Sequence, residues 1–198
     1  MKKLEALFDA TTSTLTYIVY DDASKQAIVI DPVWDLDVAA GSLFETHHEK
    51  VKAFLASKNL EPILVMETHA HADHLSGAVL MKRDYPQIKL AIGEFITSVQ
   101  EVFAPVFNLK DLNTDGSQFD ILLKEGELFE MGVFKIQVFH TPGHTPACSS
   151  YLIEDHLFTG DALFMPDSGT GRCDFPKGSA KDLYHSIQKL YQLPDETK

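Results

Sequence analysis

The chain has 198 residues, 44% of them hydrophobic, which is enough for one substantial globular domain with its own core. Its formal net charge of −12 argues against a nucleic-acid-binding groove, because such a groove needs a basic surface. No apolar run approaches the roughly 20 residues that span a bilayer, and acidic residues interrupt the N-terminal stretch, so neither a membrane segment nor a signal peptide is predicted.

Two cysteines, Cys148 and Cys173, are too few for a disulfide framework. The expected location is therefore the reducing cytoplasm. Homodimers are the commonest soluble assemblies, so a homodimer is the base-rate expectation for the oligomeric state.

Strands and helices alternate in the first half of the sequence. Apolar runs bounded by turn residues predict strands at 15–20, 27–30, 62–66 and 88–92. Helical spacing of apolar residues predicts helices at about 44–58 and 75–84, and a third that begins near Ile96 and stops near Pro105. In the first of these helices, His47 and His48 are predicted to lie on the solvated face. The alternation is typical of layered α/β packing.

The second half is richer in strands. After a polar segment at 108–119, strands are predicted at 134–138, 149–153 and 156–158. A loop at 165–178 then precedes a last helix at about 179–192, whose apolar stripe contains Leu183, Ile187 and Leu190. His140 ends a predicted strand and is interpreted as structural.

Three histidines and an aspartate crowd the loop 68–74, Thr-His-Ala-His-Ala-Asp-His, between a buried strand and a helix. Imidazole is the commonest metal ligand in proteins. Residues two apart in an extended stretch point the same way, so His69 and His71 are predicted to face one ion. Asp73 and His74 face a second ion or a substrate, unless Asp73 instead caps the following helix.

Two more candidate ligands, His144 and Asp161, also follow predicted strands. Strand ends at one edge of a sheet converge in space although their loops lie far apart in the sequence. We therefore expect His144 and Asp161 to join the histidines of the loop 68–74 in a metal site.

These motifs resemble a known family. The segments 68–74, 141–145 (Thr-Pro-Gly-His-Thr) and 159–161 (Thr-Gly-Asp) are similar in order and spacing to those of the metallo-β-lactamase superfamily. That resemblance implies an αββα sandwich with the metal site between the sheet edges. Four longer stretches of the sequence resemble the bacterial persulfide dioxygenases (sulfur dioxygenases), which are related to glyoxalase II. These stretches are residues 96–108, 143–152, 160–167 and 171–176.

The narrower resemblance implies one Fe(II) per chain that oxidises glutathione persulfide with O2 to sulfite and glutathione. Carried onto this chain, it makes His69, His144 and Asp161 the iron ligands, a facial triad that leaves three positions open. The secondary residues His71, Asp73 and His74 then orient a ligand, hold a water or move protons, and Asp73 and His74 are the candidate catalytic residues.

The substrate site is expected in the loop 165–178. Arg172 either holds a glutathione carboxylate there or braces the loop through Asp167 or Asp174. Phe175 either lines a pocket or packs the loop. Cys173 is a weak candidate for a reactive thiol.

Two alternatives to the dioxygenase remain open. One is a zinc-dependent thioester hydrolase resembling glyoxalase II (hydroxyacylglutathione hydrolase), in which one or two Zn(II) ions, held by all six candidate ligands, generate hydroxide from water. Against it, the only histidine after Asp161 is His185, which lies in the last predicted helix. The other is a non-catalytic metal-binding fragment. The single predicted domain, residues 1–198, ends about where a further strand and a late histidine are expected, so we expect it to lack C-terminal elements.

Overall fold

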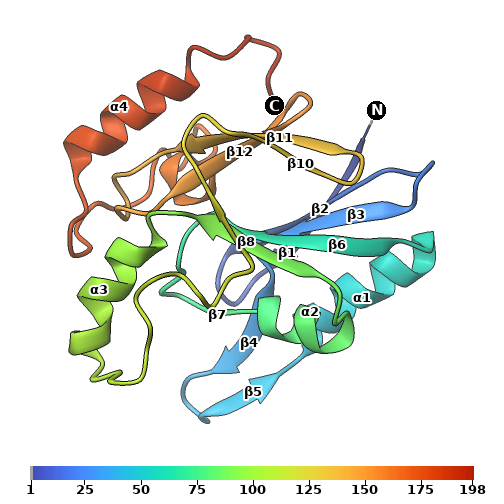
Figure 1. Ribbon diagram of the computed structural model, residues 1–198, viewed down its shortest axis with the longest axis horizontal. Coiled ribbons are helices and arrows are strands. Elements are labelled where there is room, and N and C mark those ends of the chain that lie inside the picture. The colour runs from blue at the N-terminus through green and yellow to red at the C-terminus, as the bar shows by residue number, and fades with distance from the viewer. Residues whose placement is uncertain (1) are drawn as a thin grey trace. The chain divides into compact units, whose positions relative to one another are not determined.

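The computed structural model describes residues 2–198, which form two compact units of strands and helices (Figure 1). The first unit contains the residues up to Glu67, His71–Ala91 and Met131–Val133. The second contains Thr68–Ala70, Ile92–Glu130 and Phe134–Lys198. The mixture of sheets and helices confirms the predicted α/β class.

A twisted sheet forms the centre of the first unit. Its strands follow the order β1-β2-β3-β6-β8, and they are β1 (Lys3–Asp9), β2 (Thr14–Tyr20), β3 (Gln26–Ile30), β6 (Glu61–Glu67) and β8 (Lys89–Gly93) (Figure 1). The β2–β3 pair is the predicted antiparallel hairpin. The β3–β6 pair is parallel and places Ile30 opposite Met66. Both strands therefore end at the same edge of the sheet.

Two helices, α1 (Thr46–Lys58) and α2 (Ala78–Asp84), pack their apolar residues onto one core with this sheet. The prediction of solvated His47 and His48 is wrong, because each is only 1% exposed. Nε2 of His47 lies 2.9 Å from Thr16 Oγ1, and Nε2 of His48 lies 3.0 Å from Asp84 Oδ2. Each partner satisfies one ring nitrogen, whereas Nδ1 of both rings is buried with no hydrogen-bond partner among the described residues.

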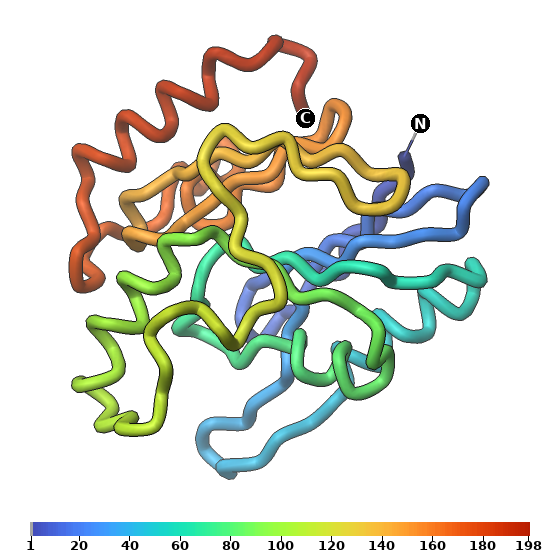
Figure 2. Tube along the Cα trace, viewed as in Figure 1, coloured from blue at the N-terminus to red at the C-terminus, as the bar shows by residue number. Residues whose placement is uncertain are grey.

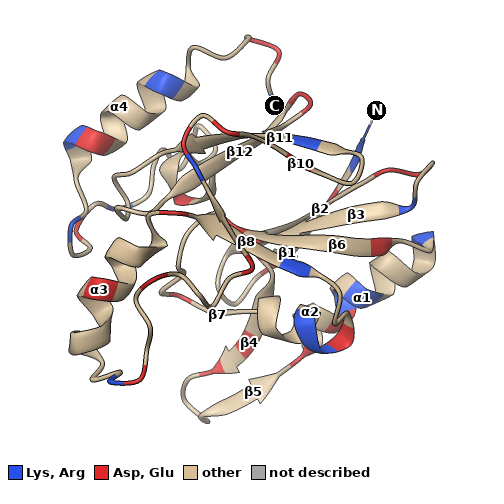
Figure 3. Cartoon of the chain, viewed as in Figure 1, with Lys and Arg blue, Asp and Glu red and all other residues tan. Residues whose placement is uncertain are grey.

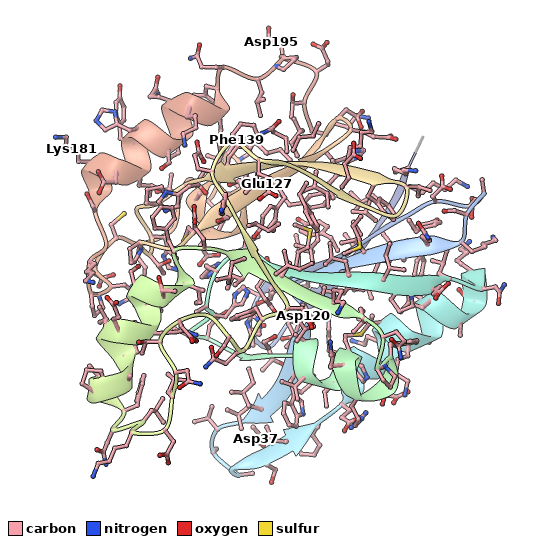
Figure 4. The ribbon with its side chains drawn as sticks, viewed as in Figure 1. Asp37, Asp120, Glu127, Phe139, Lys181 and Asp195 are labelled. Carbon is pink, nitrogen blue, oxygen red and sulfur yellow. The ribbon has the colours of Figure 1, made fainter. Side chains whose placement is uncertain are left out.

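A small sheet in the same unit was not predicted; it consists of β4 (Val33–Asp37), β5 (Ser42–Phe44) and β7 (Leu75–Ser76). The β4–β5 turn is closed by Asp37, whose Oδ1 accepts a hydrogen bond of 3.0 Å from the Ala40 N–H (Figure 4). Leu75 pairs with Trp34 as a strand residue, so the predicted helix at 75–84 begins only at Ala78. Its N-cap is Gly77, and the alternative that Asp73 caps it is therefore wrong.

The second unit contains a four-stranded sheet in sequence order, formed by β10 (Leu128–Met131), β11 (Phe134–His140), β12 (Ser149–Ile153) and β13 (His156–Phe158). The Glu127 carboxylate accepts from the Lys124 N–H in the turn before β10 (Figure 4). Strand β9 (Ile121–Leu123) is tied to the segment after β8, because the Glu94 N–H donates to the Leu123 carbonyl. The short helix η1 (Gly160–Ala162) follows β13.

Two helices belong to this unit, α3 (Ile96–Val106) and α4 (Ala180–Leu190). The predicted stop at Pro105 is nearly right, since this residue occupies the last turn of α3. A long loop, traced in Figure 2, connects η1 to α4, and Ser179 caps α4 by accepting from the Asp182 N–H. Acidic and basic residues are both scattered over the helices and loops, and α3 carries only an acidic one (Figure 3). Within residues 2–198, no helix has the length and apolarity needed to cross a membrane.

Candidate metal centre

Two histidines and one aspartate from three separate loops meet in the second unit. Asp161 Oδ2 lies 3.3 Å from His144 Nε2 and 3.9 Å from His69 Nε2, and one donor atom from each residue falls within 4.8 Å of the others. Metal–ligand bonds of about 2.0–2.1 Å place neighbouring donors roughly 3.0–3.4 Å apart. Only small adjustments would bring this set onto one ion, so the three residues fit the metal that their motifs imply.

Each imidazole is oriented through its other ring nitrogen. Nδ1 of His144 lies 2.8 Å from the carbonyl oxygen of Arg172, which can only accept, so Nδ1 carries the proton and Nε2 keeps its lone pair. Nδ1 of His69 lies 3.0 Å from the Thr68 hydroxyl. Such partners fix the tautomer and ring orientation of metal-binding histidines.

The backbone brings the three loops together through close approaches. Gly160 has φ +49°, and a Cβ at this position would lie 2.7 Å from Thr68 Cβ. The residue before Asp161 therefore packs directly against the residue before His69, which only glycine permits. The Thr68 carbonyl in turn accepts from the Ser149 N–H at the start of β12, at 2.9 Å.

His71 belongs to a different cluster, in the first unit. Its Nε2 lies 3.2 Å from Asp31 Oδ1 and 3.3 Å from Glu67 Oε2, and all three side chains are at most 7% exposed. The partners of His71 thus differ from those of His69, whose donor atom lies near His144 and Asp161. Residues 68–74 form bends rather than an extended strand, so the two-residue alternation does not apply.

The carboxylates set the protonation of this second cluster. Burial alone would lower the pKa of His71, but Asp31 and Glu67 outweigh it and raise that pKa well above its usual value. Burial raises the pKa of Glu67. The sequence interpretation missed Asp31 and Glu67, although each is an acidic residue that directly follows or ends a buried apolar strand.

Asp73 and His74 lie beside His71 in the same unit. His74 Nδ1 lies 3.4 Å from Asp73 Oδ2, and the contact with His74 lowers the pKa of Asp73. The rings of His71 and His74 are 4.2 Å apart. Among the described residues, Nε2 of His74 is buried with no hydrogen-bond partner, an arrangement that suits a metal ligand or a proton carrier.

The loop after η1 places Arg172 and Phe175 near His144. The Phe175 ring lies 5.0 Å from the His144 ring, and the Arg172 guanidinium lies 4.8 Å from the Phe175 ring centroid. Arg172 was expected to brace the loop through Asp167 or Asp174. The structure contains the contact with Asp174, in which Arg172 Nη2 lies 2.9 Å from Oδ2.

Other candidates have structural surroundings. Burial raises the pKa of the Cys173 thiol, and the Asp174 charge adds to this effect, which argues against a reactive thiolate. His140 stacks on Phe95 at 4.0 Å, and its Nε2 lies 2.8 Å from the Pro146 carbonyl, in keeping with the structural interpretation. His185 is exposed on α4.

Comparisons with known proteins agree with the motifs. A protein of Dictyostelium discoideum named "Glyoxylase B2" is 43% identical over 198 residues, covering 99% of this chain and 68% of that protein. The human "Persulfide dioxygenase ETHE1, mitochondrial" is 30% identical over 196 residues, covering 98% of this chain and 65% of that protein. The crystal structure of ETHE1 from Myxococcus xanthus superposes with a TM-score of 0.77 at 31% identity, covering 98% of this chain and 72% of that one.

The chain spans a smaller part of other relatives. It covers 45% of the "Beta-lactamase hydrolase-like protein" of Xylella fastidiosa (strain Temecula1 / ATCC 700964), to which it is 40% identical over 196 residues. The family described as "Metallo-beta-lactamase superfamily" matches residues 10–197. The resemblance inferred from the motifs and the predicted fold are both confirmed, and the chain belongs to the metallo-β-lactamase superfamily.

Proposed function

We propose that this chain is a non-haem Fe(II) persulfide dioxygenase that oxidises glutathione persulfide. The observation that supports this proposal most directly is the donor set around Asp161, two imidazole Nε2 atoms and one carboxylate. Nε2 of His71 contacts the carboxylates of Asp31 and Glu67 instead of this donor set. Two histidines and one carboxylate are typical of ferrous oxygenases.

The proposed reaction consumes glutathione persulfide, O2 and water and yields glutathione, sulfite and two protons. When bound, ferrous iron supplies open coordination positions and a redox-active centre, which zinc does not. The outer sulfur takes up two oxygen atoms from O2 and one from water, and the S–S bond breaks with the proton and electron pair going to the glutathione sulfur.

The residues of the chain have separate roles in this proposal. His69, His144 and Asp161 hold the metal, and the Arg172 carbonyl keeps Nε2 of His144 available. His74, in contact with the Asp73 carboxylate, accepts a proton that the reaction releases. Arg172 and Phe175 contact the glutathione part of the substrate. Asp174 already engages Nε and Nη2, so a substrate carboxylate would bind Nη1 or replace Asp174.

The test is O2 uptake by anaerobically Fe(II)-loaded protein after addition of glutathione persulfide, with sulfite measured in parallel. We expect uptake in the parent, none in His144→Ala, and unchanged uptake in His185→Ala, a matched change of an exposed histidine. Folded, iron-loaded protein that takes up no O2 would refute the proposal.

The second candidate is a zinc-dependent thioester hydrolase. It is favoured by the relative named "Glyoxylase B2" and by the buried, unpartnered Nε2 of His74 beside His71 and Asp73, which together form a second possible metal cluster. Hydrolysis of S-lactoylglutathione by zinc-loaded protein, with two zinc ions per chain, would replace the dioxygenase with this function.

A further inference from the structure

Helix α4 contacts two of the three segments that carry the candidate metal ligands. It donates hydrogen bonds to the segment 140–143, which ends directly before His144, and it contacts η1, which contains Asp161. All of these elements belong to the second unit. The helix can therefore set the distance between the two ligands, whose donor atoms are 3.3 Å apart.

The segment 140–143 depends on such outside contacts for its placement. His140 is the last residue of β11, and the residues that follow it up to His144 belong to no strand or helix. The last of them, Gly143, is the residue type with the greatest backbone freedom. A functional site tolerates errors of only about 0.5 Å in the position of its side chains. Hydrogen bonds to this segment therefore decide how well the His144 backbone is placed.

Two serines hold the end of the segment. Oγ of Ser186 donates to the Pro142 carbonyl at 2.8 Å, and Ser186 is only 3% exposed. The N–H of Ser179, the cap of α4, donates to the Gly143 carbonyl at 2.8 Å. Water reaches the position of the Ser186 hydroxyl poorly, so the Pro142 carbonyl would lose its donor if that hydroxyl were removed.

An ion pair holds the beginning of the segment. Lys189 Nζ donates to the His140 carbonyl at 2.7 Å and to Glu125 Oε1 at 2.8 Å. The other carboxylate oxygen of Glu125 accepts from the His140 N–H. Both main-chain groups of His140 are therefore engaged by one charged pair. A partly exposed ion pair contributes little by itself, whereas its hydrogen bonds to the backbone are charge-assisted and therefore stronger than neutral ones.

We propose that Ser186 and Lys189 are positioning residues of the metal site. From α4 they fix the backbone before His144, and so keep its Nε2 at the distance from Asp161 that one ion requires. The Arg172 carbonyl orients the His144 ring separately, so the backbone and the ring of this ligand have different supports. The proposal rests on the proposed function only through the assignment of His144 and Asp161 as metal ligands.

The test is zinc affinity, measured by competition with a chromophoric chelator at fixed pH. We expect the folded double variant Ser186→Ala/Lys189→Met to bind zinc about tenfold more weakly than the parent, the lower end of the loss that follows when the support of a ligand is removed. Lys189→Arg keeps the charged donor and should bind zinc as the parent does. Lys181→Met, a change of an exposed lysine near the start of α4, is the matched control (Figure 4).

The background His144→Ala separates positioning from a purely structural role. Because Ser186 and Lys189 act through His144, the double substitution should leave the residual zinc affinity of this background unchanged. An equal loss in both backgrounds, or the parent affinity in the folded double variant, would overturn the proposal. If the double variant does not fold, Lys189→Met alone takes its place, since Lys189 is partly exposed.

A second readout uses the metal-free protein. His144 is 5% exposed and its Nδ1–H donates to the Arg172 carbonyl, so this proton is protected from exchange and reports on the ring in the NMR spectrum of histidine-labelled protein. Its resonance should shift in the double variant and stay in place in Lys181→Met. A resonance at the parent position in the double variant would contradict the proposal. Neither readout involves O2 uptake, so failure of this inference and failure of the dioxygenase activity are distinguishable.

Discussion

Replacing Gly143 with alanine is expected to disturb both the stability of the protein and its metal site. Gly143 has φ +146°, a region that residues with a Cβ rarely adopt. An added Cβ would lie 2.5 Å from the backbone nitrogen of Leu183 in α4 and still closer to its Cα and Cβ. The clash involves helix backbone, so no side-chain rotation relieves it. Gly143 also directly precedes His144 and accepts from the Ser179 N–H at the helix cap.

The magnitude follows from two additive costs. The unfavourable φ costs about 1–3 kcal/mol. Overpacking against a fixed backbone costs about 1–3 kcal/mol. The expected loss in the free energy of unfolding is therefore about 2–6 kcal/mol, a large part of the roughly 5–15 kcal/mol that stabilises a typical domain. A shift of α4 that moves His144 should also weaken metal binding by about tenfold, which corresponds to roughly 1.4 kcal/mol.

Gly126→Ala supplies the matched control. Gly126 has φ +73°, and an added Cβ there would meet no atom within 4 Å. It should show the backbone cost of about 1–2 kcal/mol alone and leave metal affinity unchanged. Urea unfolding of the metal-free proteins and zinc competition measure the two quantities. If Gly143→Ala cost no more stability than Gly126→Ala, the inferred contact between the His144 loop and α4 would be refuted.

Four further predictions concern single side chains. Arg172→Ala should raise the KM for glutathione persulfide about tenfold with little change in kcat, since a charge-assisted hydrogen bond contributes about 1.5–3 kcal/mol; an unchanged KM would limit Arg172 to bracing the loop. Asp174→Asn should leave this KM unchanged or lower it, because Asp174 competes for the guanidinium. Ser179→Ala should cost about 1 kcal/mol in urea unfolding by removing the cap of α4. Burial lowers the pKa of His47 below its usual 6.5, so the folded state favours the neutral ring. The resulting stabilisation is complete above pH 6.5 and falls as the pH drops through that value. The free energy of unfolding should decrease by at most about 1.4 kcal/mol per pH unit. Urea midpoints at pH 7 and 5.5 should differ less in His47→Gln than in the parent.

The elements that were predicted well share one property: their pattern is set by burial. The strand predicted at 27–30 is β3, and the helix predicted at 44–58 is α1, because continuous apolar runs and helical spacing report directly on what each element packs against. The strands β4, β5 and β7 were missed because they are short and partly exposed. Their identity comes from pairing, as between Trp34 and Leu75, which no local pattern encodes.

The cluster of possible metal ligands was predictable for a different reason. His144 and Asp161 stand in loops directly behind strands, and loops of this kind converge at a sheet edge whatever their separation in the sequence. The division between His69 and His71 was not predictable, because the alternation rule holds only for extended backbone. Here the chain bends at Thr68 and His69 and again at 72–74, so neighbours in the sequence reach different partners.

The partners of His71 illustrate what a pattern of candidate ligands leaves out. A histidine in a metal motif also needs a partner for its other ring nitrogen, and the motif does not say which residue supplies it. Asp31 and Glu67 are 36 positions apart in the sequence, and only the parallel register of β3 and β6 makes them neighbours. Because both are buried, their interaction with the His71 ring is less screened than a surface pair would be. The surroundings of His71 therefore depend on two carboxylates that belong to no metal motif.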